Sequence, residues 1–77
     1  MNKKAMNALK LDYLTLLKRL DSLEIRERTE SINFQIQCTV AKINEFNRVL
    51  YLFGYHTEIT VDEDGNADKV FIIKNED

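Results

Sequence analysis

The sequence predicts an α+β fold in which an antiparallel two-helix hairpin is followed by a C-terminal two-stranded β-hairpin. Three observations support this fold. Residues 5–20 are rich in leucine at helical spacing, residues 32–53 carry an apolar stripe at the same spacing, and an Asp-Gly pair separates two β-rich runs near residue 65. The chain has 77 residues, which is enough for one small α+β domain spanning 1–77 and leaves no room for a second core.

The first predicted helix covers residues 5–20. It contains no Gly or Pro, and its apolar side chains fall on one wide face: Met6, Leu9, Tyr13, Leu16, Leu17 and Leu20. Leu14 widens this face, whereas Leu11 lies outside it. The segment 21–24 has the spacing of a capping box, which predicts a bend or a restart near Asp21. Residues 26–31 are polar and are expected to connect the two helices.

The second predicted helix contains an apolar stripe within an arc of about 140° at 100° per residue. The stripe consists of Ile32, Ile36, Val40, Ile43, Phe46, Leu50 and Phe53. Residues 32–40 also alternate between apolar and polar side chains, which is typical of a half-buried strand and gives an α-β-α-β-β alternative. Continuity with residues 42–53 favours the helix, and Gly54 is expected to end it.

Two strands, 57–61 and 69–74, are predicted around a turn at 62–66, where Gly65 supplies the positive φ that a tight turn needs. The second strand is apolar on both faces, and a two-stranded sheet has two open edges. A second subunit would cover both, so we expect a homodimer. The residues expected to mediate self-association are Leu11, Leu14, Val70, Phe71, Ile72 and Ile73. The stripe over 32–53 is interpreted as part of the same assembly surface.

The composition argues against an enzyme and against any cofactor or metal. Cys38 is the only cysteine, His56 is the only histidine, and there are two glycines. One thiol cannot form an internal disulfide, one imidazole is too few for a metal site, and no Gly-rich phosphate loop is present. We expect Cys38 to be a buried apolar residue in a cytoplasmic protein. No apolar run reaches the ~18 residues of a membrane span, so no membrane association is expected.

The net charge of −2 hides a gradient along the chain, from +4 over residues 1–20 to −5 over residues 57–77. Each end supplies a set of candidate partner-binding residues. The basic set lies on one flank of the first helix: Lys3, Lys4, Lys10 and Lys18. The acidic set lies on the hairpin: Glu58, Asp62, Glu63, Asp64 and Asp68, together with Asp77.

These features predict a function through binding. The first hypothesis is a small cytosolic regulator or inhibitor that occupies the surface of a partner protein. The bias toward Ile, Asn and Lys, without Pro or Trp, is typical of an AT-rich source such as a low-GC bacterium, its phage or another mobile element. The alternative is a nucleic-acid-binding module that uses the lysine flank to contact phosphates.

Overall fold

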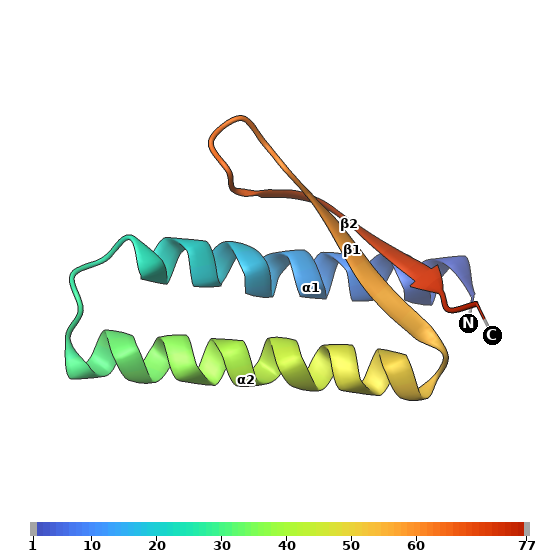
Figure 1. The fold of residues 1–77 in the computed structure, drawn as a ribbon, viewed down its shortest axis with the longest axis horizontal. Coiled ribbons are helices and arrows are strands. Elements are labelled where there is room, and N and C mark those ends of the chain that lie inside the picture. The colour runs from blue at the N-terminus through green and yellow to red at the C-terminus, as the bar shows by residue number, and fades with distance from the viewer. Residues whose placement is uncertain (1, 77) are drawn as a thin grey trace.

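The computed structural model describes residues 2–76 and confirms the predicted order of two helices and a β-hairpin. Helix α1 spans Lys3–Glu24 and helix α2 spans Glu30–Leu52, followed by strands β1 (Tyr55–Val61) and β2 (Ala67–Lys74). The two helices lie antiparallel and side by side, and the hairpin crosses them diagonally so that its tip projects past α1 (Figure 1).

Side-chain caps and a glycine define the ends of the helices. The Asn2 side chain accepts a hydrogen bond from the Ala5 amide at 2.8 Å, and Thr29 Oγ1 accepts one from the Ile32 amide at 3.1 Å. Gly54 follows α2 with φ of 87°, a conformation that favours glycine, and it ends the helix as predicted.

The predicted bend near Asp21 is wrong, because α1 continues without a break to Glu24. The carboxylate of Asp21 has another role. It accepts a hydrogen bond from the backbone amide of Ala67 at 3.3 Å and so joins the end of α1 to the start of β2. A tertiary contact therefore takes the place of the local cap that the spacing suggested.

Residues 32–40 are helical, so the strand alternative is wrong. The Thr29 cap fixes where the helix begins, and no turn residue separates this segment from the rest of α2. The buried positions follow the spacing of a helix and not the alternation of inward and outward residues that is typical of a strand. Thr39 is 3% exposed and donates a hydrogen bond to the Gln35 carbonyl at 2.8 Å, whereas Phe34 is 66% exposed.

The hairpin has a regular antiparallel register, with Thr57 opposite Ile72 and Ile59 opposite Val70, and a bulge between Thr60 and Val61. Its predicted turn is confirmed. Asp62 Oδ1 accepts hydrogen bonds from the amides of Asp64 and Asn66, each at 3.0 Å, and Gly65 adopts φ of 82°.

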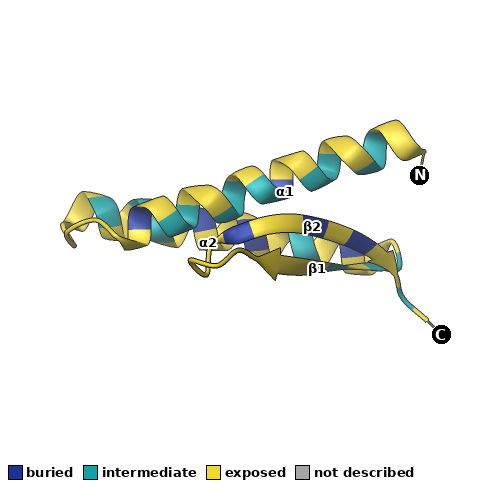
Figure 2. Cartoon of the chain, turned by 90° about the horizontal axis from the view of Figure 1, so that it is seen from above, coloured by how far each residue is buried: buried dark blue, intermediate teal, exposed yellow. Residues whose placement is uncertain are grey.

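The molecule has two layers, because the hairpin covers one face of the helix pair (Figure 2). Val70 and Ile72 point toward the helices and are buried, whereas Phe71 and Ile73 point outward and are 43% and 36% exposed. The buried apolar residues between the layers and between the helices are Tyr13, Leu23, Ile43, Leu50, Ala67, Val70 and Ile72.

The single chain thus uses part of the surface that the sequence assigned to self-association. Val70 and Ile72 are core residues, and Leu14 packs against the cluster of Tyr13, Ile43 and Val70. Hairpin and helices cover Val70 and Ile72 within one chain, whereas Leu14 is half-buried there. Leu11, which is 65% exposed, remains on the surface together with Phe71 and Ile73.

Candidate functional site

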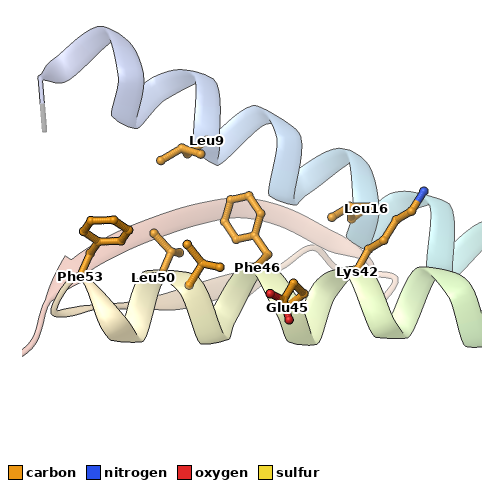
Figure 3. Close-up of a pocket in the computed structure, with 8 residues that line it drawn as sticks. Leu9, Leu16, Lys42, Glu45, Phe46, Leu50 and Phe53 are labelled. Atoms are coloured by element: carbon orange, nitrogen blue, oxygen red, sulfur yellow. The ribbon is translucent and has the colours of Figure 1, made fainter.

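An apolar groove runs between α1 and α2, with a volume of about 460 Å³. Leu9 and Leu16 of α1 form one wall, and Phe46, Val49, Leu50 and Phe53 of α2 form the other. No hairpin residue lines it, and the ribbon of the hairpin passes behind these side chains (Figure 3). The hairpin therefore leaves this side of the helix pair uncovered.

The exposure of two wall residues shows how open the groove is. Phe53 is 71% exposed and Val49 is 39% exposed, although both are apolar. In Figure 2, α1 diverges from the hairpin toward its N-terminal end, the end of the helix that carries Leu9. The divergence leaves the end of the groove near Leu9 and Phe53 without a covering element.

Charged side chains stand only at the rim of the groove, where Lys42 and Glu45 lie one helical turn apart. Arg48 donates two hydrogen bonds to the Glu45 carboxylate, from Nη2 at 2.6 Å and from Nε at 3.1 Å. The hydrogen bonds from Arg48 hold the pKa of Glu45 below its ordinary value, and the Arg48 cation offsets the negative charge of this carboxylate.

The sequence patterns did not predict this groove. The stripe of seven apolar residues over 32–53 faces mainly inward, since Ile43 and Leu50 are buried and Ile32, Ile36 and Phe46 are half-buried. Val49 and Phe34 belong to a different face of the same helix. A search for a second apolar stripe on α2 would have found them.

The predicted basic residues all lie on α1. Lys3, Lys4 and Lys18 are exposed and Lys10 is half-buried. Lys18 shares a polar hollow with Asp21 and Asp62 at the tip of the hairpin. Among residues 2–76, the only ion pairs within 4 Å are Arg48–Glu45 and His56–Glu58.

The predicted acidic residues are exposed along the hairpin, with Asp62, Glu63 and Asp64 in its turn and Glu58 and Asp68 on its strands. Asp77 lies outside the described residues. The structure separates this set from the groove, because none of these carboxylates lines it. Asp62 is committed to the turn through its two backbone hydrogen bonds.

His56 joins the two strands at the end of the hairpin next to α2. Its ring nitrogens contact Asn75 Oδ1 and, at 3.3 Å, Glu58 Oε1. The second contact shows that His56 and Glu58 project from the same side of the strand. Hydrogen bonds to Asn75, which has the larger effect, and to Glu58 raise the pKa of His56 above 6.5, because both partners favour the protonated ring.

We expect the titration of His56, followed by NMR through the single imidazole of the chain, to have its midpoint above 6.5. Asn75→Ala should lower the midpoint more than Glu58→Gln, since Asn75 makes the larger contribution. The protonated ring stabilises the folded state, so this contribution is complete below pH 6.5 and is lost as the pH rises through the folded-state pKa. An unchanged midpoint in both variants would contradict the hydrogen-bonding geometry.

The expectation that Cys38 is buried is wrong, because its side chain is exposed on α2. At 100° per residue it lies on the same side of the helix as Lys42, Glu45 and Val49. Within residues 2–76, no group of three or more His, Cys, Asp or Glu side chains is placed to hold a metal ion.

The described helices are also not of the kind that crosses a membrane, since neither combines sufficient length with sufficient apolar character. Comparison with protein-family models, with curated proteins and with solved structures finds no match for this chain.

Proposed function

We propose that this chain is a protein-interaction module and that the groove between α1 and α2 is its interface. The observation that carries the proposal is the exposure of apolar side chains in and beside the groove, with Phe53 at 71% and Leu52 at 68%. Continuous apolar surface of this kind is costly in water and is typical of sites that bind another polypeptide. The self-association expected from the sequence belongs to the same proposal.

The lining of the groove favours a polypeptide over a small molecule. Its walls are apolar, and its charged groups, Lys42 and Glu45, are confined to the rim. A small-molecule site needs polar groups inside the cavity to orient the ligand. An open groove between two helices, with an apolar floor and a charged edge, instead suits the apolar face of an amphipathic helix.

Nucleic acid is a weaker alternative. The lysines of α1 lie outside the groove, and the carboxylates of Asp21 and Asp62 stand beside Lys18 and would repel phosphates. A regulator or inhibitor that occupies a partner protein is therefore the function that we favour.

The test uses a photo-crosslinking amino acid placed on either side of α2. Val49 lies in the groove, and Val40 lies nine residues earlier, which is about two and a half turns and so on the opposite side of the helix. The two valines are matched in type and exposure, at 39% and 38%.

We expect irradiation in an extract of the native cells, or of the purified chain alone, to give a polypeptide adduct from position 49 and none from position 40. Mass spectrometry identifies the adduct, and Val49→Asp should abolish binding of the identified polypeptide in purified form, whereas Val40→Asp should not. Equal adducts from both positions, or none from position 49, would refute the proposed interface.

A further inference from the structure

On the side of α2 that lines the groove, exposed side chains continue beyond the groove and form a second stripe along the helix. At 100° per residue they fall within an arc of about 120°. Its members are Phe34, Cys38, Ala41, Lys42, Glu45, Val49, Leu52 and Phe53, and none of them is buried. The stripe begins about two turns before the groove and ends at its last residue, so it continues the same surface toward the start of α2.

This stripe is self-complementary about a point between Ile43 and Asn44. Three pairs of stripe residues at equal distances on either side of that point are matched, one pair in opposite charge and two in apolar character. The pairs are Lys42 with Glu45, Cys38 with Val49, and Phe34 with Phe53. In an antiparallel pair of identical helices related by a two-fold axis, each residue faces the residue at the same distance on the other side of the axis.

We propose that the occupant of the groove is a second copy of this chain, with the two α2 helices antiparallel about a two-fold axis at that point. The inference rests on the proposed function, since it names the polypeptide that the groove accepts. It differs from the assembly surface predicted from the sequence, because β2 contributes nothing to it.

Charge is the main reason for choosing a second copy. In this arrangement Lys42 of each copy faces Glu45 of the other, whose carboxylate Arg48 of the same copy also binds, so that one rim supplies the opposite charges of two symmetric ion pairs. A foreign helix would have to provide the same charges in the same order. The aromatic ends also match, since Phe34 and Phe53, at 66% and 71% exposed, would pack against each other between copies.

The incomplete burial of the core in a single chain is a second reason for placing another copy on the groove. No side chain among residues 2–76 is less than 2% exposed. A domain of this size that lacks disulfides and metal is commonly stabilised by association. A second copy on the groove would cover Val49, Leu52 and Phe53, apolar side chains that neither the hairpin nor α1 covers.

The first test exchanges the rim charges. Lys42→Glu alone places Glu opposite Glu, and Glu45→Lys alone places Lys opposite Lys, so each variant should dimerise about tenfold or more weakly than the wild type. An equimolar mixture of the two variants should form a heterodimer, because both facing pairs are then of opposite charge. The double variant should dimerise by itself for the same reason. Sedimentation equilibrium measures all four samples, and circular dichroism checks their folding.

The second test uses thiols. In this arrangement Cys38 faces residue 49 of the other copy, whereas residues 38 and 49 of one helix are ~16 Å apart. The variant Val49→Cys should therefore be crosslinked to a covalent dimer by a bis-maleimide with a reach well below that distance. Two controls should remain uncrosslinked, namely the wild type with Cys38 alone and the double variant Cys38→Ser, Val49→Cys, because their single thiols are also ~16 Å apart across the axis.

The results of these tests distinguish a failure of the proposed dimer from a failure of the proposed interface. A wild-type mass of twice 9.1 kDa, with recovery in the charge-exchanged mixture and a crosslink only in Val49→Cys, supports the dimer. Wild-type monomer at every concentration, or a dimer indifferent to both tests, overturns it. If a foreign polypeptide then still crosslinks to position 49, the groove remains an interface, and if nothing crosslinks there, the proposed function fails as well.

Discussion

Leu50→Ala is expected to lower the free energy of unfolding by about 3 kcal/mol, which is most of what a domain of this size has available. Leu50 is 3% exposed and lies on α2 where the helix faces both the floor of the groove and the core. Truncation removes the buried methyl groups and leaves a cavity that the stiff surrounding helices cannot fill. A large fraction of the variant should therefore be unfolded without denaturant.

Urea denaturation followed by circular dichroism measures the effect, with wild type and variants at one protein concentration because association makes the apparent stability depend on concentration. Leu11→Ala is the matched control. It makes the same change in a helix, but Leu11 is 65% exposed, so its effect should stay within about 0.5 kcal/mol. Similar losses for both leucines would mean that the core described above is not the core that stabilises the chain.

The second large effect is expected from Asn47→Ala, which should cost about 2 kcal/mol. The Asn47 side chain links three elements, because Nδ2 donates to Tyr13 Oη on α1 at 3.1 Å and Oδ1 accepts from Thr57 Oγ1 on β1 at 2.8 Å. Tyr13 is 5% exposed, so its hydroxyl loses a partner that water does not easily replace.

A further variant distinguishes the loss of these hydrogen bonds from the loss of side-chain volume as the cause of the destabilisation. The triple variant Asn47→Leu, Tyr13→Phe, Thr57→Val removes all three polar groups together and should recover much of the loss, since no group is then left unpaired. Asn33→Ala, an exposed position on the same helix, should change the stability by less than about 0.5 kcal/mol. If the triple variant is no more stable than Asn47→Ala, the hydrogen bonds are not the cause.

The element order was predictable because its signals are local. Leucine spacing marks α1, Gly54 ends α2, and Asp62 with Gly65 builds the turn. Residues 32–40 were ambiguous because their apolar residues fit both periods, and the Thr29 cap resolves them to helix. The bend predicted at Asp21 was wrong because the Asp21 carboxylate accepts its hydrogen bond from a residue 46 positions away. No local sequence pattern reveals a partner at that distance.

The groove was harder to predict, for a different reason. Which face of a helix pair stays open depends on where the hairpin packs, and that choice depends on long-range contacts such as Thr57 with Asn47. The sequence shows that the helices carry more apolar surface than one contact needs. It does not show that Ile43 and Val70 face each other in the core while Val49 remains outside.

The burial of β2 also has a consequence for biosynthesis. Of the seven buried apolar residues among 2–76, Ala67, Val70 and Ile72 belong to this strand, and it is translated after the other three described elements. The helices therefore emerge from the ribosome ahead of the strand that shields them, and until it follows they expose the hydrophobic surface that chaperones and aggregation both act on. Folding can be completed only after β2 has emerged.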